Sequence, residues 1–524
     1  MSQHDVALLT ELADGQVRPV TVEDTRILLF REGDTIHAVG ATCPHAGAPL
    51  AEGVRDGHRI ICPWHKATFC LRTGALLEPP AVDDLPHYAV RRDGDRVEVT
   101  LPAEQPAQPA PSVDQRVSVD QRVFGDQRVF AIIGGGAAGA LAAQTLRQAG
   151  FGGRIIMLDR ENRVPYDRTL LSKYHLSGQP GAEKSPLQSQ SFYRQQGIER
   201  RTAEVEVLEA GAKTIHCADG TTLTYDAALL ATGAAPILPH LPGAHLDNVF
   251  LLRSRQDADA ILAQAERSER AVILGASFIG MEVAASLRER GLEVTVVGRE
   301  SAPFEKQLGA RVGNAFVALH RRQGVMFRLG AAIEVLTGER SVEAVTLAGG
   351  ERLPADLVVV GFGVKPVTSY LRGVTLNDDG SVSVDASLKA ADGLYAAGDI
   401  ARFPYRDASI RVEHWRVAEQ QGRVAALAMM GRAVRYDKVP VFWTIQYMKQ
   451  LDYIGHAADW DDVVIHGDLE KPAFLAYYVK NGRVVAAAGF DRDRDTGALI
   501  VLFEQRQDWT PDALGDAPSR LLRP

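Results

Sequence analysis

The chain has 524 residues, of which 46% are hydrophobic and 24% charged, so we expect several domains with more than one hydrophobic core. Lys and Arg number 58 against 66 Asp and Glu, giving a formal net charge of −8. This balance excludes the strongly basic surface typical of proteins that bind nucleic acids or anionic lipids. We therefore expect neither a nucleic-acid nor a membrane partner.

The beginning of the chain, MSQHDVALLTELADG, has no basic region followed by an apolar stretch. No run approaches the ~18 apolar residues of a membrane helix. The four cysteines are too few for a disulfide framework in a chain of this length and suit a reducing compartment. These features predict a cytoplasmic protein.

Residues 1–101 show alternating apolar segments, RILLF and TIHAVG and then HYAVRRDGDRVEVTL, in which Asp93-Gly94 signals a hairpin. This pattern predicts a small all-β domain. Residues 102–127 follow as a linker, in which a Pro/Ala-rich stretch precedes three copies of Asp-Gln-Arg-Val that begin at Asp114, Asp120 and Asp126.

Two loops of the all-β region each combine a thiol with an imidazole. They read Cys43-Pro-His45 and Cys62-Pro-Trp-His65. A Rieske centre binds one iron through two thiolates and the other through two imidazoles, so paired mixed loops are typical of it. Cys43, His45, Cys62 and His65 are therefore the predicted ligands of a [2Fe-2S] cluster. Tetrahedral zinc is the alternative, while Cys70 lies beyond the ligand set and is predicted to pack in the core.

The stretch CPHAGAPLAEG…CPWHKATFCLRTG resembles Rieske ferredoxins and the Rieske domains of ring-hydroxylating oxygenase systems. High-potential Rieske proteins place hydroxyl donors where this chain has Ala67 and Phe69. Fewer hydrogen bonds to the cluster lower its potential. We therefore expect a low-potential cluster.

From residue 128 onward, apolar strands alternate with Ala-rich helices, which predicts parallel-sheet α/β domains. The strand Val129–Ile133 runs into a G-x-G-x-x-G loop formed by Gly134, Gly136 and Gly139, and a helix follows. This context is the signature of a dinucleotide site.

A second unit follows the strand Ala271–Leu274, with Gly275 and Gly280 flanking Ser277 at the middle position. Two such units predict two dinucleotides. The acid expected after the next strand is replaced by Gly298, followed by Arg299, which can accommodate a 2′-phosphate. The choice between NADH and NADPH stays open.

Residues 376–435 are predicted to return to the first dinucleotide domain, and 436–524 to form an antiparallel sheet joined by Asn481-Gly482. The pattern resembles that of flavoproteins with two dinucleotide sites, which implies the domains 128–250 and 376–435 for FAD, 251–375 for NAD(P) and 436–524 for a C-terminal α+β domain. The predicted fold class is an all-β Rieske domain followed by an α/β flavoprotein with two dinucleotide sites, like glutathione reductase.

Further motifs carry a resemblance to a known family: Ala231-Thr-Gly233, Leu394-Tyr-Ala-Ala-Gly-Asp399, Pro165-Tyr-Asp-Arg168 and Leu171-Ser-Lys173. With them, residues 128–524 resemble the ferredoxin reductases of oxygenase systems and apoptosis-inducing factor. The whole chain resembles the Rieske-fused, apoptosis-inducing-factor-like branch of that family.

The resemblance implies roles for individual residues. Lys173, Glu282 and Phe278 would act at the flavin during hydride transfer, Lys173 pairing with Glu282. Contacts to FAD are implied for Gly134, Gly136, Gly139, Glu161, Arg168, Lys173, Val205, Thr232, Gly233, Arg253, Gly398, Asp399, Glu413, His414 and Trp443. Contacts to the nicotinamide nucleotide are implied for Gly275, Ser277, Ile279, Gly280, Arg299 and Gly363. The ligand of the FAD ribose stays open between Asp159 and Glu161, of which we favour Glu161.

These observations predict hydride transfer from NADH or NADPH to FAD, followed by single-electron transfer to the cluster and on to an acceptor such as an oxygenase, a cytochrome or another redox protein. A self-contained oxidoreductase with a small-molecule acceptor and a redox-responsive interaction protein are the alternatives. Disulfide-reductase chemistry is excluded because Ser172 stands where a redox cysteine would be needed. Both a monomer and a homodimer are compatible with the sequence.

Overall fold

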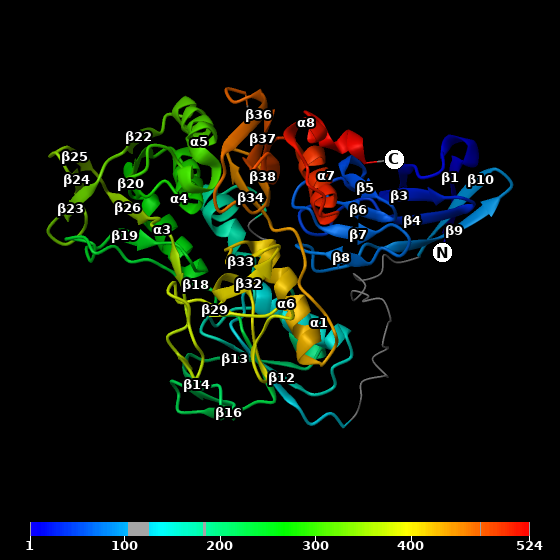
Figure 1. The fold of residues 1–524 in the computed structure, drawn as a ribbon, viewed down its shortest axis with the longest axis horizontal. Coiled ribbons are helices and arrows are strands. Elements are labelled where there is room, and N and C mark those ends of the chain that lie inside the picture. The colour runs from blue at the N-terminus through cyan, green and yellow to red at the C-terminus, as the bar shows by residue number, and fades with distance from the viewer. Residues whose placement is uncertain (1, 103–124, 182–184, 472, 523–524) are drawn as a thin grey trace.

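The computed structural model describes residues 2–102, 125–181, 185–471 and 473–522, which form four regions (Figure 1). The linker predicted over 102–127 falls almost entirely outside these ranges, including the Asp-Gln-Arg-Val copies at 114 and 120. The third copy, at Asp126, leads directly into strand β11 (Val129–Ile133), as expected.

The N-terminal region is all-β, as its alternating pattern predicts. An antiparallel sheet has the order β1-β10-β9-β4-β3-β2, and a smaller sheet, β5-β6-β7-β8, carries the second cysteine–histidine loop between β6 and β7. The strands are β1 (Ser2–Leu8), β2 (Val17–Val22), β3 (Thr25–Glu32), β4 (Thr35–Gly40), β5 (Val54–Asp56), β6 (Arg59–Ile61), β7 (Thr68–Cys70), β8 (Leu76–Glu78), β9 (His87–Asp93) and β10 (Arg96–Leu101). Cys70 is buried in β7, in agreement with its predicted packing role.

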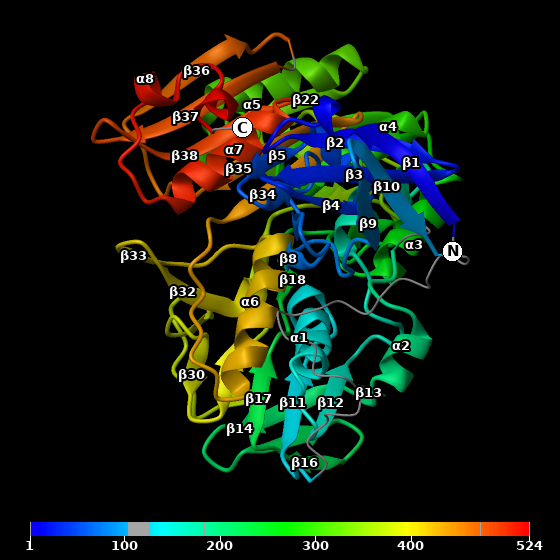
Figure 2. The same ribbon diagram turned by 90° about the vertical axis from the view of Figure 1, so that its right-hand side faces the viewer.

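The first dinucleotide-binding region is a doubly wound parallel sheet, ordered β13-β12-β11-β17-β31-β30 with β30 antiparallel at its edge. The helices α1 and α6 pack closely against each other on one face of this sheet (Figure 2). Gly422 of α6 permits this approach, because it lies against the backbone of Ala138 in α1 and has no side chain. The elements are α1 (Ala137–Gln148), β12 (Arg154–Asp159), α2 (Gln190–Gln195), β13 (Ile198–Thr202), β17 (Ala227–Leu230), β30 (Lys389–Ala391), β31 (Leu394–Ala396) and α6 (Trp415–Met429).

The second dinucleotide-binding region repeats this plan with the parallel order β19-β26-β20-β21-β22. Its first strand starts at Val249, slightly before the predicted boundary at 251. The elements are β19 (Val249–Leu251), α3 (Arg255–Ala265), β20 (Arg270–Leu274), α4 (Phe278–Glu289), β21 (Glu293–Gly298), α5 (Glu305–Arg322), β22 (Met326–Leu329) and β26 (Leu357–Val360).

Short ribbons, most of them antiparallel, extend from the two α/β regions. They are β14 (Val205–Glu209), β15 (Thr214–Cys217), β16 (Thr222–Thr224), β18 (Ala234–Pro236), β23 (Ile333–Thr337), β24 (Ala344–Leu347), β25 (Arg352–Pro354), β27 (Val364–Pro366), β28 (Leu371–Arg372), β29 (Val382–Ser383), β32 (Ala401–Tyr405) and β33 (Ala408–Ile410). The antiparallel pair β18–β27 links the two α/β regions.

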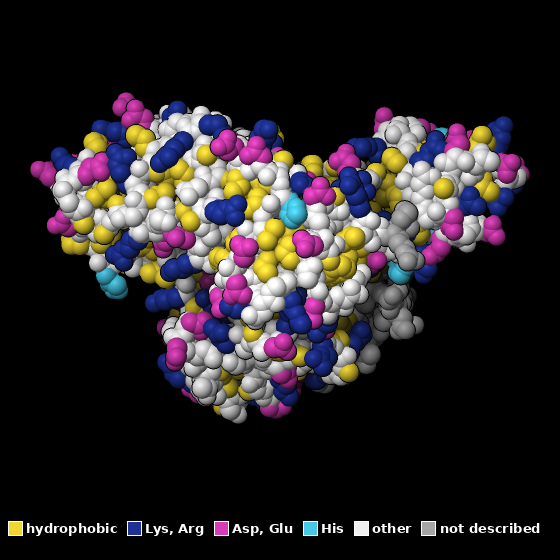
Figure 3. Space-filling model, turned by 45° about the horizontal axis from the view of Figure 1, so that its top comes forward, with side chains coloured by type: hydrophobic (Ala, Val, Ile, Leu, Met, Phe, Trp, Pro, Cys, Tyr) yellow, Lys and Arg dark blue, Asp and Glu magenta, His cyan; other side chains and the backbone are white. Residues whose placement is uncertain are grey.

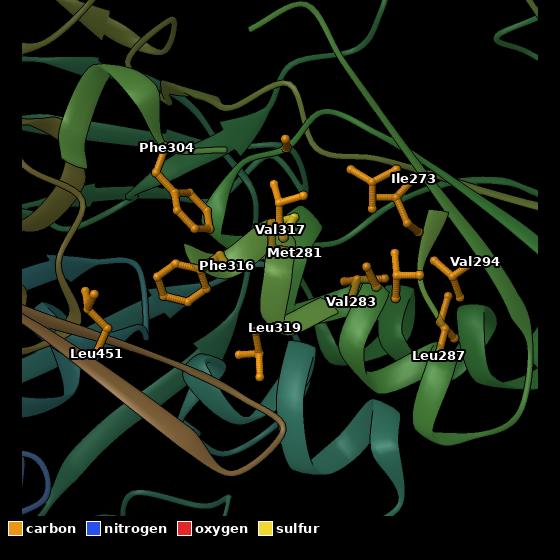
Figure 4. Packing of buried hydrophobic residues seen from close by; sticks show 14 of the residues in the cluster. Ile273, Met281, Val283, Leu287, Val294, Phe304, Phe316, Val317, Leu319 and Leu451 are labelled. Atoms are coloured by element: carbon orange, nitrogen blue, oxygen red, sulfur yellow. The ribbon is translucent and has the colours of Figure 1, made fainter. Parts of the chain in front are cut away.

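The C-terminal region is the predicted α+β domain, an antiparallel sheet ordered β34-β35-β38-β37-β36. Its core continues into the second α/β region, where Leu451 packs in one cluster with Phe316 and Val294 (Figure 4). The elements are β34 (Val441–Gln446), β35 (Lys449–Gly455), β36 (Asp462–Asp468), β37 (Ala473–Lys480), β38 (Arg483–Phe490), α7 (Asp493–Glu504) and α8 (Pro511–Leu514).

Charged side chains of both signs are interspersed over the face shown in Figure 3. Among the described residues, no helix is both long and apolar enough to cross a membrane.

The N-terminal domain is docked against α6 and α7 rather than held only by its connection (Figures 1 and 2). Val54 and Ile61 pack with Ala498 and Val501 of α7 in one apolar cluster. Polar contacts also join the N-terminal domain to α6 and to the segment that follows α6. Arg416 Nε donates to the Pro79 carbonyl at 2.9 Å, Gln420 Nε2 donates to Glu78 Oε2 at 2.7 Å, and Lys438 pairs with Glu78 at 2.8 Å.

A buried ion pair anchors the cluster loop itself. Lys66, which follows His65, is inaccessible to solvent, and its Nζ lies 2.7 Å from Asp452 Oδ2 on β35. Asp452 also accepts hydrogen bonds from Thr496 Oγ1 at 2.7 Å and Gln450 Nε2 at 2.8 Å. Removing one partner of such a pair leaves an uncompensated buried charge, which costs far more than the loss of an exposed pair.

We therefore expect Lys66→Met to destabilise the docked arrangement by about 3–5 kcal/mol, since it strands the Asp452 carboxylate. The matched control is Lys449→Met, because Lys449 lies on the same strand as Asp452 but forms a partly exposed ion pair, with Asp491. Loss of that pair should cost under about 1 kcal/mol. Calorimetric unfolding of the full-length variants measures both. Equal losses for the two variants would contradict the importance of burial.

Candidate active site

A cavity of about 620 Å³ lies between the two α/β regions and the C-terminal sheet. Its walls come from the β11–α1 loop, the start of α4, the start of α6 and β34. Most of the residues predicted to contact FAD or to take part in hydride transfer line it, as does Ile279 from the set predicted for the nicotinamide nucleotide: Gly134, Gly136, Glu161, Arg168, Lys173, Val205, Thr232, Gly233, Arg253, Phe278, Glu282, Gly398, Asp399, Glu413, His414 and Trp443. These side chains come from segments far apart in the chain.

Glycine is needed at the three positions of the first loop for different physical reasons. Gly134 has φ 106°, and a Cβ there would lie 2.3 Å from the Ala231 carbonyl. A Cβ on Gly139 would lie 2.0 Å from the Gly134 carbonyl, so Gly139 lets the helix approach the strand. Gly136, in contrast, has open space within 4 Å, on the cavity side. Only at Gly136 is the space left for a ligand.

Next to this loop, Glu161 and Arg168 form an ion pair of 2.6 Å that Tyr166 completes. The Tyr166 hydroxyl donates to Glu161 Oε2 at 2.8 Å and accepts from Arg168 Nη1 at 2.9 Å. Burial raises the pKa of Tyr166 to about 12, so the phenol stays protonated. Asp159 also lines the cavity, and burial raises its pKa above the usual range. Both carboxylates considered for the ribose are therefore at the cavity.

The residues predicted for hydride transfer meet at the inner end of the cavity. Lys173 Nζ lies 3.1 Å from Glu282 Oε2, and both side chains are more than 90% buried. Glu282 also accepts hydrogen bonds from Ser172 Oγ and, at 2.7 Å, from Thr444 Oγ1. The Phe278 ring stacks on Phe304 with centroids 4.3 Å apart and lines the same cavity.

On the opposite wall, Arg253 Nη2 pairs with Asp399 Oδ2 at 3.0 Å, beside Gly233. Burial raises the pKa of Glu413, which pairs with Arg411 at 2.7 Å. Burial also lowers the pKa of His414 to about 3, so this imidazole is neutral. Its Nδ1 is buried without a hydrogen-bond partner, which suits a site that a polar ligand completes.

The second dinucleotide loop has the same strand–turn–helix geometry. Gly275 has φ 104°, a Cβ on Gly280 would lie 2.3 Å from the Gly275 carbonyl, and Ser277 Oγ accepts from the Gly280 amide at 3.2 Å. The neighbouring strand β21 ends at Gly298, with Arg299 exposed directly after it. Gly363 lies beyond β26 and pairs by its carbonyl with Ile237.

The four predicted cluster ligands meet at one end of the N-terminal domain. The Nδ1 atoms of His45 and His65 are 3.0 Å apart, and the thiols of Cys43 and Cys62 hydrogen-bond each other. That bond lowers the pKa of Cys62 and raises the pKa of Cys43, whereas burial lowers the pKa of His65, so a neutral imidazole is favoured.

The ligands are thus paired two and two, as a [2Fe-2S] cluster with Cys₂ on one iron and His₂ on the other requires. In the described ranges, no three or more Cys, His, Asp or Glu side chains gather round one metal-ion position. Tetrahedral zinc needs four donors around a single point.

The histidine pair faces the flavin cavity across the domain interface. The His65 ring lies 4.8 Å from the ring of Trp443, and the His45 ring 6.5 Å from it. Trp443 is buried and lines the cavity. One indole therefore separates the predicted cluster ligands from the flavin site.

Sequence reasoning missed several residues of this site. Thr444 and Ser172 bind Glu282, Tyr166 bridges Glu161 and Arg168, and Asp167 approaches His45 with 3.7 Å between Oδ2 and Nε2. Ser172, Tyr166 and Asp167 stand inside motifs that the sequence had already singled out. Thr444 carried no local signal, because its partner is 162 residues away.

Comparison with known proteins agrees with this geometry. The Rieske [2Fe-2S] domain family matches residues 2–89, the pyridine nucleotide-disulphide oxidoreductase family residues 129–422 and the reductase C-terminal family residues 441–523. The chain is 36% identical to apoptosis-inducing factor 3 of Mus musculus, over 93% of this chain and 82% of that protein. It is 32% identical to the ferredoxin–NAD(+) reductase subunit of the benzene 1,2-dioxygenase system of Pseudomonas putida, over 75% of this chain and 96% of that one.

Solved structures of ferredoxin reductases are also similar to this chain. Putidaredoxin reductase in its covalent complex with putidaredoxin has a TM-score of 0.71 at 28% identity, covering 75% of this chain and 98% of the reductase. A ferredoxin reductase from Rhodopseudomonas palustris has a TM-score of 0.72 at 29% identity, and the match covers 76% of this chain and 100% of that reductase.

Fold, site and comparisons define a flavoprotein reductase with its own Rieske domain. It uses NAD(P)H and FAD and passes electrons to the [2Fe-2S] cluster and on to an acceptor. The chain belongs to the pyridine nucleotide-disulphide oxidoreductase family, in its Rieske-fused, apoptosis-inducing-factor-like branch. The zinc alternative is overturned by the match to the Rieske family.

The two glycines of the first loop offer a direct test of the FAD site. Gly136→Ala should fold normally but bind FAD at least about tenfold more weakly, because the new Cβ fills space that the protein leaves open. Gly139→Ala should instead lower the stability of the fold by about 1–3 kcal/mol, because its Cβ meets the Gly134 carbonyl. Flavin content and thermal unfolding distinguish them. Normal FAD content in Gly136→Ala would refute the assignment of Gly136 as the position where FAD approaches the backbone.

Proposed function

We propose that this chain is a one-polypeptide electron-transfer unit in which reduction of FAD is followed by transfer across Trp443 to the Rieske centre and then to an external redox protein. The observation that carries this proposal is the 4.8 Å ring contact between His65 and Trp443 at the cavity wall. A docked Rieske domain needs no diffusional encounter, so fusion raises its effective concentration at the flavin.

When bound, FAD accepts a hydride from the nicotinamide and releases electrons singly to the cluster. The protein supplies position and charge. Lys173, held by Glu282 and by the Thr169 carbonyl at 2.7 Å, presents a fixed cation at the inner end of the cavity. Phe278 lines the cavity where the second dinucleotide loop reaches it, and the Phe304 ring stacks on Phe278.

The acceptor that we propose is a protein of an oxygenase or cytochrome system. Similarity to reductases whose names place them in dioxygenase systems supports this class. A disulfide acceptor has no chemical support, because Ser172 is bound to Glu282 at the cavity and all four cysteines are buried as free thiols elsewhere.

The test is anaerobic reduction of the full-length protein by NADH and by NADPH, followed by flavin absorbance and by the EPR signal of the cluster. The wild-type chain should show both flavin bleaching and a Rieske signal. His45→Ala and His65→Ala should retain flavin bleaching and lose the Rieske signal, because each removes one of the two imidazole donors.

Cys70→Ala is the matched control, since Cys70 is a buried thiol outside the ligand set. It should keep both signals. Flavin bleaching without any cluster signal in the wild-type chain would refute the electron-transfer unit and favour a redox-responsive interaction protein.

The donor that we propose is NADPH. Strand β21 lies beside the Gly275 loop, which is where a carboxylate would bind the ribose hydroxyls of NADH, but it ends in Gly298. A Cβ there would be 3.3 Å from Ala276 Cβ, so little space exists for a longer side chain. The exposed Arg299 guanidinium suits a 2′-phosphate, since it can bind phosphate oxygens bidentately.

Arg299→Ala should therefore reduce kcat/KM for NADPH by about tenfold or more, a loss of ~1.4 kcal/mol, while kcat/KM for NADH changes less than about twofold. Stopped-flow flavin reduction measures both. Arg352→Ala, an exposed arginine at the start of β25, serves as the control for simple loss of charge. An equal effect of Arg299→Ala on both nucleotides would refute this donor assignment.

A further inference from the structure

Asp167 reaches from the flavoprotein to a predicted ligand of the cluster. It precedes the short turn Arg168–Leu170, and its Oδ1 accepts the Thr169 amide at 2.7 Å. Its own amide donates to the Ser185 carbonyl, so both backbone and side chain are fixed. The second oxygen, Oδ2, faces the Rieske domain at 3.7 Å from His45 Nε2, with only 7% of the side chain exposed.

The nitrogen that Asp167 approaches is the outer one. The Nδ1 atoms of His45 and His65 face each other at 3.0 Å, so Nδ1 is the iron-binding atom of each ring and Nε2 points away from the cluster. A carboxylate at the second nitrogen of a ligand imidazole fixes the ring and increases electron donation to the metal. Its negative charge also opposes the addition of an electron, all the more in a poorly solvated interface.

The charges near the two imidazoles differ. His65 packs against Trp443, and the cations Lys66 and Lys173 lie close enough to act on it. Asp452 is neutralised by its pair with Lys66. Glu419 is fully buried near Asp167, and burial, together with the Asp167 charge, raises the pKa of its carboxyl well above the usual range. Among the described residues, Asp167 is the carboxylate with an oxygen within 4 Å of a ring nitrogen of His45.

We propose that the Asp167 carboxylate of the reductase, whose Oδ2 lies 3.7 Å from His45 Nε2, acts through its charge as a positioning residue that lowers the reduction potential of the cluster while the Rieske domain is docked. The proposal rests on the assignment of His45 as a cluster ligand. Because effects on coupled equilibria are reciprocal, a group that lowers the potential of the docked cluster must weaken docking of the reduced domain by the same factor. For a one-electron couple, a tenfold weakening corresponds to 59 mV.

This coupling bears on how an external acceptor reaches the cluster. The side chain of His65 is buried and that of His45 is only 16% exposed, so the ligand edge that receives electrons is largely covered in the docked state. Electron arrival that loosens docking would uncover that edge for an acceptor. Return of the oxidised domain would then be favoured.

The first experiment measures the cluster potential by EPR in poised samples of the full-length protein. Asp167→Asn removes the charge but keeps an oxygen that can accept the Thr169 amide. It should raise the potential relative to wild type. Glu504→Gln is the matched control, because Glu504 is an interface carboxylate that pairs with Arg59 at 3.2 Å and touches no predicted ligand. Its potential should equal that of wild type.

The second experiment tests whether the effect requires docking. Gly497 of α7 faces the Rieske domain, and a Cβ there would lie 3.0 Å from Val54 Cγ2. Gly497→Arg should therefore separate the domains and raise the potential as Asp167→Asn does. Adding Asp167→Asn to Gly497→Arg should produce no further shift, which a double-mutant cycle detects.

An unchanged potential in Asp167→Asn, or an equal shift in Glu504→Gln, would overturn the proposal. So would a full additional shift of Asp167→Asn in the Gly497→Arg background. If Gly497→Arg does not fold, the comparison of Asp167→Asn with Glu504→Gln decides alone. A wild-type chain without a Rieske signal would instead overturn the ligand assignment itself, whereas a normal signal with an unshifted potential refutes only the role of Asp167.

Discussion

The buried ion pair between Lys66 and Asp452 connects the two halves of the electron path. Lys66 follows His65 in the cluster loop, and Asp452 stands directly opposite Trp443 in the β34–β35 hairpin. The same pair therefore fixes the loop of one centre against the indole at the wall of the other. Because both groups are removed from water, their mutual attraction is strong and neither can be lost singly without a large cost. The apolar contact of Val54 and Ile61 with α7 adds area, but the charge pair determines which residues face each other.

Docking restricts electron transfer to an external acceptor, because it covers the edge of the Rieske domain that carries His45 and His65. The Asp167 carboxylate at the outer nitrogen of His45 provides a physical reason for the docked state to hold the oxidised domain better than the reduced one. The same short segment also carries Arg168 and Lys173, which line the flavin cavity. A single segment thus contacts both cofactor sites, and changes at one site can be felt at the other.

Much of the architecture could be predicted because local patterns carry it. The glycine loops lie at strand ends followed by helices, and the Asp93-Gly94 and Asn481-Gly482 turns join the expected hairpins. The cluster ligands were also predictable, because the chemistry of a Rieske centre requires two mixed loops at short spacing. The interactions of Glu282 could not be predicted as a set. Its partners Ser172 and Thr444 lie 110 and 162 residues away, and hydrogen bonds between distant segments leave no periodic trace in a sequence.

The sequence by itself determined the classes of cofactor, since glycine spacing and paired Cys–His loops are properties of short segments. It also determined that disulfide chemistry is absent from the flavin, because Ser172 replaces the needed thiol. Only the tertiary structure decided how the centres meet: that His65 lies against Trp443, that Lys66 is buried on Asp452, and that Asp167 reaches His45. The reason is that these contacts depend on how separately folded domains dock, and docking is set by the complementarity of complete surfaces rather than by any local pattern.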